Sequence, residues 1–106
     1  MEALAVVADP TRRQILEYLR GGERGAGELG DHFPISRPAV SRHLRVLREA
    51  GLVISRIEGQ RRIYSLDARP LAELDEWLEP YRHFWAQRLD ALDTEIRRGR
   101  RDRSTT

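Results

Sequence analysis

The segment from Ser36 to Gly51 constrains the fold of this chain more than any other part of the sequence. Ser36 is a strong helix N-cap residue, and Pro38 is tolerated at the second helical position because the N–H group that it lacks has no partner there in any case. We therefore expect Ser36 to accept a hydrogen bond from the backbone N–H of Ala39. Gly51 suits the left-handed conformation that ends many helices. The sequence thus predicts a helix over about residues 36–50.

The two faces of this predicted helix differ in chemistry. At about 100° per residue, Val40, Leu44 and Leu47 share a narrow arc, which predicts the buried face. The opposite arc carries only arginine and serine side chains, namely Arg37, Ser41, Arg42, Arg45 and Arg48. A face that is merely solvated usually mixes acids and bases, since opposite charges four positions apart stabilise a helix. Glu49 is the sole acid of the segment, so we expect the basic face to contact a polyanion.

The segments before this helix predict a helix-turn-helix arrangement. Asp9 and Pro10 are suited to open an earlier helix, which Gly21 and Gly22 end. A short helix is expected over about residues 26–33, followed by a tight connection. In helix-turn-helix proteins the second helix enters the major groove of DNA, and its N-terminal residues reach the base edges.

Two strands are expected after Gly51, over residues 52–58 and 62–66, with Gly59 and Gln60 as the hairpin turn. A basic hairpin in this position is typical of a wing, whose tip contacts the DNA backbone or minor groove. The basic residues around the turn are Arg56, Arg61 and Arg62, and one of them could instead pair with Glu58 across the hairpin. Arg61 is nearest the tip, whereas Arg62 could equally be structural because it shares a face with Tyr64 and Leu66.

Seven residues are accordingly predicted to contact DNA. Arginine pairs bidentately with guanine, serine reaches a base or a phosphate, and small side chains let the helix approach closely. The predicted contacts are Ser36, Arg37, Pro38, Ser41, Arg42, Arg45 and Arg61.

A long helix is expected from about Pro70 to Ile96, with a continuous apolar stripe and a kink at Pro80. Its stripe and one N-terminal leucine predict a dimer interface, consisting of Leu4, Leu74, Trp77, Tyr81, Phe84, Trp85, Leu89 and Leu92. Aromatic residues are enriched at such interfaces, although the same aromatics could line a small-molecule pocket. Residues 1–96 are expected to form one DNA-binding and dimerisation domain, and residues 97–106 a basic, disordered tail.

Composition narrows the function classes. The chain has 106 residues, 19 basic side chains that are all arginine, a formal net charge of +2 and no cysteine. The absence of cysteine excludes disulfides and thiolate metal ligands. Neither a long apolar run nor a secretory signal is present, so we expect a cytoplasmic protein with no membrane partner. No catalytic constellation or phosphate loop is found, and we therefore expect neither an enzyme nor a cofactor.

Three stretches of this sequence, Asp9–Leu16, Ile35–Val53 and Gly59–Leu66, resemble regulators of the ArsR/SmtB type, and the likeness extends over about residues 3–96. The resemblance implies a mainly α winged helix-turn-helix fold with a small β-hairpin, in the order α-α-α-α-β-β-α. It also implies a dimer formed through the first and last helices. Most members of the family are repressors that leave DNA when an inducer binds.

The chain departs from the metal sensors of this family. Many of them carry a cysteine pair at the start of the helix expected here at residues 26–33, and others use Asp and His pairs on the last helix. This last helix offers one histidine, His83, among the carboxylates Asp75, Glu76, Glu79, Asp90 and Asp93. A zinc site commonly uses several histidines, so we expect no metal. The stretch from Trp77 to Trp85 resembles a branch of the family that is not known for metal sensing.

Together these features predict a sequence-specific transcriptional repressor that acts as a homodimer. Two copies of the 36–50 helix would occupy successive major grooves about 34 Å apart, on an imperfectly palindromic operator. Repression of its own gene and release by an unidentified inducer are further expectations from the resemblance. Two alternatives stay open, a metal-responsive repressor that uses His83 with carboxylates of the last helix, and a winged-helix module that binds proteins.

Overall fold

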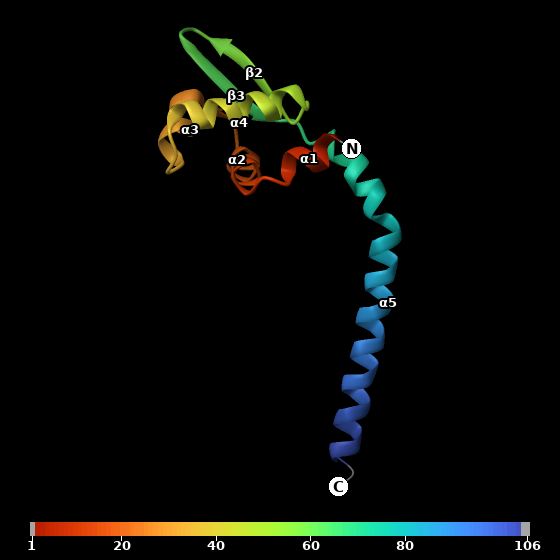
Figure 1. Cartoon of the computed structure of the whole chain (residues 1–106). Helices are drawn as coiled ribbons and strands as arrows, with labels where there is room; N and C mark the ends of the chain where they lie inside the picture. The colour runs from red at the N-terminus through yellow and green to blue at the C-terminus, as the bar shows by residue number, and fades with distance from the viewer. Residues whose placement is uncertain (1, 105–106) are drawn as a thin grey trace. The chain divides into compact units, whose positions relative to one another are not determined.

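The computed structural model describes residues 2–104, with side chains to residue 99. In that range the elements follow in the order α1 (Glu2–Val7), α2 (Pro10–Arg20), β1 (Arg24–Gly25), α3 (Ala26–His32), α4 (Arg37–Glu49), β2 (Val53–Glu58), β3 (Arg61–Leu66) and α5 (Leu71–Ser104), as Figure 1 shows. The chain up to Leu74 forms one compact unit, and α5 from Asp75 onward forms a second. None of the described helices is long and apolar enough to cross a membrane.

Local capping explains where α2 begins and ends. The backbone N–H of Arg12 donates to Asp9 Oδ1 at 3.0 Å, and Pro10 occupies the start of the helix. This hydrogen bond is the main reason why the pKa of Asp9 lies below its ordinary value. After Gly21 the backbone of Gly22 has a φ of 144°, which favours glycine and ends the helix. The predicted N-cap of α2 is therefore confirmed.

The structure confirms the helix predicted at residues 36–50. Ser36 Oγ accepts a hydrogen bond from the backbone N–H of Ala39 at 3.3 Å, and Pro38 lies in the first turn. Glu49 is the last residue of α4, and Gly51 follows with a φ of 77°. Because residues at both ends limit the helix as predicted, the side chains of α4 lie on the faces that the sequence predicted for them.

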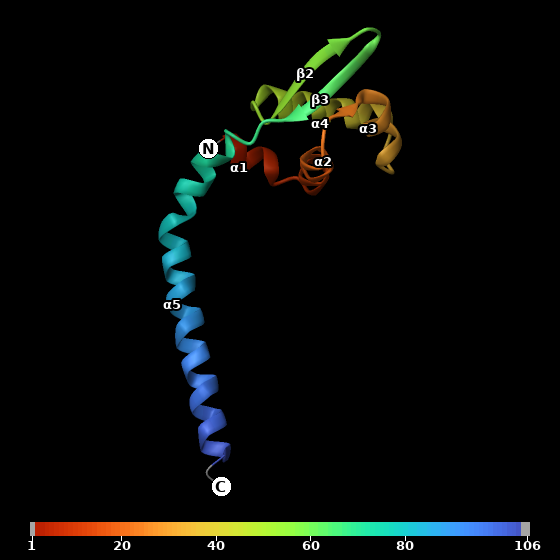
Figure 2. The same ribbon diagram turned by 180° about the vertical axis from the view of Figure 1, so that it is seen from behind.

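The strands form a three-stranded antiparallel sheet in the order β1-β3-β2. Val53 pairs with Leu66 and Glu58 with Arg61, so a two-residue turn at Gly59 and Gln60 closes the hairpin as predicted. In Figures 1 and 2 this hairpin lies beside α4, and β2 contacts that helix. Strand β1 was not predicted, because two residues show no alternation and their ladder partners lie about 40 positions further along the chain.

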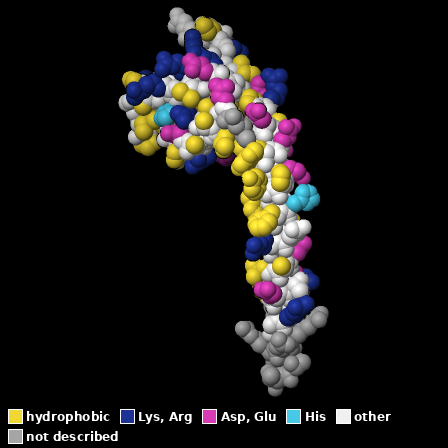
Figure 3. All heavy atoms as spheres, turned by 45° about the vertical axis from the view of Figure 1, so that its right-hand side comes forward, with side chains coloured by type: hydrophobic (Ala, Val, Ile, Leu, Met, Phe, Trp, Pro, Cys, Tyr) yellow, Lys and Arg dark blue, Asp and Glu magenta, His cyan; other side chains and the backbone are white. Residues whose placement is uncertain are grey.

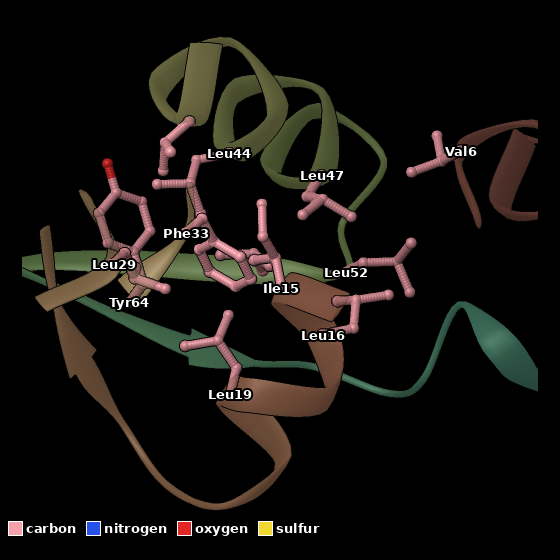
Figure 4. Packing of buried hydrophobic residues seen from close by; sticks show 12 residues of the cluster. Val6, Ile15, Leu16, Leu19, Leu29, Phe33, Leu44, Leu47, Leu52 and Tyr64 are labelled. Carbon is pink, nitrogen blue, oxygen red and sulfur yellow. The ribbon is translucent and has the colours of Figure 1, made fainter. Parts of the chain in front are cut away.

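The core of the first unit lies between α2, α3, α4 and the sheet. Its fully buried side chains are Ile15, Leu29, Leu47, Leu52 and Val53. Val40, Leu44 and Leu47 are all buried, and Figure 4 shows Leu44 and Leu47 directed from α4 toward Ile15. The predicted apolar face of α4 is thus confirmed, and its basic face is the outward one.

Helix α5 extends further than the sequence predicted. It continues through Pro80 as one helix, so the sequence alternative of a break there is excluded, and the favoured kink stays a prediction. The helix also runs to Ser104, beyond the predicted end at Ile96, while residues 105 and 106 lie outside the described range. An ion pair of 3.0 Å between Arg97 and Asp93, one helical turn apart, favours this continuation.

Candidate nucleic-acid interface

The outward face of α4 presents the side chains that the sequence singled out. All seven predicted DNA contacts are exposed: Ser36, Arg37, Pro38, Ser41, Arg42, Arg45 and Arg61. Six of them lie on α4 or its N-cap, and Arg61 lies at the hairpin turn. Burial of Val40, Leu44 and Leu47 holds this face in a fixed orientation, since a rotation of the helix would expose the apolar arc.

A hollow of about 250 Å³ lies between α4 and the hairpin. It is lined by Ser41, Arg42, Arg45, Arg48, Arg62 and Tyr64. Four guanidinium groups around one hollow attract anions such as DNA phosphates. We call this feature the arginine hollow.

The arginine hollow includes three residues that were absent from the predicted DNA contacts. Arg48 lies on the basic arc of α4 and could have been included from its position alone. Arg62 shares the hollow with the α4 arginines, although its sequence position suggested a structural role as readily. Tyr64 is buried at 7% exposure and could not have been assigned from the sequence, because only the tertiary structure brings this residue of β3 to the same hollow as the arginines of α4.

The exposed arginines of α4 fall into two groups, those that form an ion pair with a carboxylate and those that do not. Among the side chains that the structure describes, none of the ion pairs involves Arg42, Arg45 or Arg48. Arg37, by contrast, places Nη2 2.8 Å from Asp31 Oδ1. The centre of the α4 face therefore keeps its guanidinium groups available to an external partner.

Two of the three hairpin arginines, Arg56 and Arg61, are also paired. Arg61 Nη2 lies 3.5 Å from Glu28 Oε1 of α3, so the side chain nearest the wing tip folds back toward that helix. Arg56 pairs with Glu23 and, at 3.1 Å, with Glu58. These two carboxylates raise the pKa of Arg56, Glu23 contributing the larger part. An arginine does pair with Glu58 as one alternative had it, but along β2 rather than across the hairpin.

The predicted dimer residues on α5 form an exposed apolar stripe. Figure 3 shows apolar side chains in a row along one side of this helix. Trp77, Phe84, Trp85 and Leu89 are between 46% and 65% exposed, whereas Leu74 is half-buried. The rings of Trp77 and Tyr81 are 4.9 Å apart. Aromatic rings that remain this exposed favour burial against another surface. Leu4, on α1, is 41% exposed.

His83 lies on the polar side of α5. Its Nε2 is 3.7 Å from Glu79 Oε1, and the side chain is 79% exposed. Within the described residues, no three side chains of the His, Cys, Asp and Glu types come together as a metal site. A metal centre at His83 would therefore need ligands from a second chain.

Comparisons with known proteins agree with this geometry. Residues 9–55 match the family described as bacterial regulatory protein, arsR family. The HTH-type transcriptional regulator Rv2034 of Mycobacterium tuberculosis is 47% identical over 87 residues, which cover 82% of this chain and 78% of that protein. The transcriptional repressor SdpR of Bacillus subtilis is 40% identical over 72 residues, which cover 68% of this chain and 80% of that protein.

A solved structure supports the same assignment. The ArsR-like transcriptional regulator from Rhodococcus sp. RHA1 is 32% identical, with a TM-score of 0.67 over 86% of each chain. The predicted winged helix-turn-helix fold is thereby confirmed, with β1 as an additional strand. Members of this family are DNA-binding regulators rather than enzymes. This chain, with its outward basic α4 and its β2–β3 wing, belongs to the arsR family of transcriptional regulators.

Proposed function

We propose that the protein is a homodimeric repressor that reads an imperfectly palindromic operator by inserting α4 into the major groove. The observation that carries the proposal is the arginine hollow, with Arg42, Arg45 and Arg48 exposed and outside every described ion pair. Arginines of a recognition helix can pair bidentately with guanine bases in the major groove, and other arginines contact backbone phosphates. Arg42 and Arg45 are the proposed base contacts, and Arg61 is a proposed backbone contact.

The apolar stripe of α5 supports the dimer. Its aromatic residues supply the rigid apolar area that is enriched at protein interfaces. A twofold dimer would present two α4 helices, so half-sites of the operator would be separated by one helical turn, about 34 Å. Repression of the protein's own gene is part of the proposal, and its promoter is the first DNA to test.

The experiment begins with the DNA that is recovered with the protein from cells, which yields the operator. Binding of that operator is then compared for wild type, Arg42→Ala, Arg45→Ala and the Arg37/Arg42/Arg45 triple alanine variant. Loss of a bidentate base contact costs about 1–3 kcal/mol and relaxes base preference at one position. Arg20→Ala is the control, since it removes an exposed arginine of α2 that is paired with Glu17. Operator binding that survives the triple substitution would refute the groove assignment.

A further inference from the structure

Three carboxylates hold arginines at the margin of the proposed DNA interface. Asp31 holds Arg37 at the start of α4, Glu28 holds Arg61 at the wing turn, and Glu23 holds Arg56 of β2. The three acids come from one short stretch, from just before β1 to the last turn of α3. This stretch, residues 23–31, contains a single basic residue, Arg24. We call it the acidic segment.

The pairs made by the acidic segment are exposed and can therefore be broken. The side chains of Arg37 and Asp31 are 74% and 71% exposed, and those of Arg61 and Glu28 are 67% and 48% exposed. Ion pairs at such positions add little to folding stability. These ion pairs instead limit how readily the guanidinium groups can bind another anion.

Arg37 and Arg61, at the margin of the proposed interface, are expected to make a different kind of DNA contact from the arginines at the centre of α4. We place Arg61, beside the wing turn, and Arg37, at the N-terminus of α4, against phosphates, which are the same in every sequence, because helix N-termini are among the groups that contact the DNA backbone. Phosphate contacts supply nearly all of the affinity for non-specific DNA. A carboxylate that occupies such an arginine therefore lowers non-specific affinity, while the arginines outside the described ion pairs, Arg42 and Arg45, remain available for bases.

We propose that Asp31 and Glu28 are specificity-determining residues, which compete with DNA phosphates for Arg37 and Arg61. Before either arginine reaches a phosphate, it must exchange its carboxylate for the phosphate oxygen. The exchange reduces the affinity that each of these two phosphate contacts adds on any DNA. The base contacts of α4 then account for a larger share of the preference for the operator over other DNA. This inference rests on the proposed DNA-binding face of α4.

The test uses the full-length protein and a random-sequence DNA duplex without the operator, with fluorescence anisotropy at several salt concentrations. Asp31→Asn and Glu28→Gln are expected to tighten binding about two- to fivefold each, the range that one exposed ion pair commands. Each arginine that now engages a phosphate should steepen the slope of log K against log salt by up to about 0.9. Glutamine preserves the hydrogen bond that Glu28 accepts from the backbone N–H of Gly25 at 3.3 Å, so α3 keeps its cap.

Two comparisons separate direct competition from a general change in charge. Glu17→Gln removes one negative charge from an exposed pair on α2, 2.9 Å from Arg20, and should leave duplex binding nearly unchanged. In an Arg37→Ala background, Asp31→Asn should have no further effect, because its partner is gone. A gain that persists without Arg37, an equal gain from Glu17→Gln, or weaker binding of Asp31→Asn would each overturn the proposal.

Failure of this inference and failure of the proposed function give different results. If the wild-type protein binds neither the operator nor the random duplex at low salt, the DNA-binding face itself is wrong. If the wild type binds both and the carboxylate variants match it in affinity and salt slope, α4 still reads DNA and only the competition is refuted.

Discussion

At the scale of single residues, the chain uses arginine in three different ways. Arg42 and Arg45 are exposed on α4 and outside the described ion pairs, Arg37 and Arg61 are held by carboxylates, and Arg13 donates to the backbone carbonyl of Val7 at 2.7 Å. Arginine thus serves to bind an external partner, to pair with a nearby carboxylate or to stabilise the local backbone. The surroundings of each arginine determine which of these roles it has.

Asp67 provides a prediction for pH dependence. Hydrogen bonds from the side chain and the backbone N–H of Arg69 lower the pKa of Asp67 from 3.8 to about 2. Since the folded pKa is depressed, the stability from this carboxylate is present above the unfolded value and is lost as the pH falls toward 2. An NMR titration should give the low pKa directly. Arg69→Ala should return it toward 3.8, and an unchanged titration in that variant would exclude Arg69 as the cause.

Arg61 yields a second prediction at this scale. Arg61→Ala should weaken binding of the operator and of random DNA by similar factors, because a wing contact to the backbone carries no base information. It should also flatten the salt dependence, by less than the slope of one full phosphate contact, because Glu28 competes for Arg61 in the wild type. Titrations of both duplexes at matched salt decide the point. A loss confined to the operator would make Arg61 a base-reading residue instead.

At the scale of elements, the apolar periodicity of α4 determines which face the helix buries, and its caps determine where the helix begins and ends. Val40, Leu44 and Leu47 place the apolar arc on the core. Ser36 caps one end, and Gly51 follows the other. The proposed base contacts Arg42 and Arg45 lie beyond the first turn, on the exposed face.

Two glycines of the first unit should respond oppositely to alanine. Gly51 has a φ of 77°, so Gly51→Ala is expected to destabilise the fold by about 1–2 kcal/mol. Gly27 lies within α3, and a Cβ there meets nothing within 4 Å, so Gly27→Ala should stabilise by up to about 1 kcal/mol. Urea unfolding of the two variants beside wild type measures both effects. Changes of the same sign in the free energy of unfolding of the two variants would contradict this argument from backbone conformation.

At the scale of the whole molecule, the first unit has a complete core whereas α5 leaves most of its apolar stripe exposed. A helix with such a stripe is stable when a second apolar surface covers it. The proposed homodimer supplies that surface, and it also gives two copies of α4 for one operator. Folding of the dimer and cooperative DNA binding would then depend on the same residues.

The dimer is tested by placing a charge in the stripe. Phe84→Glu is expected to shift the protein from dimer to monomer in sedimentation equilibrium and to weaken operator binding at least tenfold, since burial of an unpaired carboxylate at an interface is costly. His83→Ala, an adjacent substitution on the polar side of α5, is the control and should stay dimeric. A wild-type protein that sediments as a monomer at micromolar concentration would refute the homodimer.

Much of this architecture follows from local sequence. The caps at Asp9, Ser36 and Gly51, the hairpin turn at Gly59 and the basic arc of α4 each depend on residues a few positions apart, so periodicity and capping preferences were enough to predict them. The extension of α5 beyond Ile96 was not predicted because the apolar stripe ends there, although the ion pair between Asp93 and Arg97 favours helix at that point.

The features that required the tertiary structure all join residues far apart in the chain. β1 exists only because Arg24 and Gly25 meet β3, and the arginine hollow exists only because Arg62 is brought to α4. The pairing of Arg61 with Glu28 likewise depends on how the wing lies on α3. Capping and helical periodicity depend on residues within about one turn of each other, so they can be predicted from the sequence. Which distant side chains meet is decided by core packing, and that determines which arginines are held and which remain open to DNA.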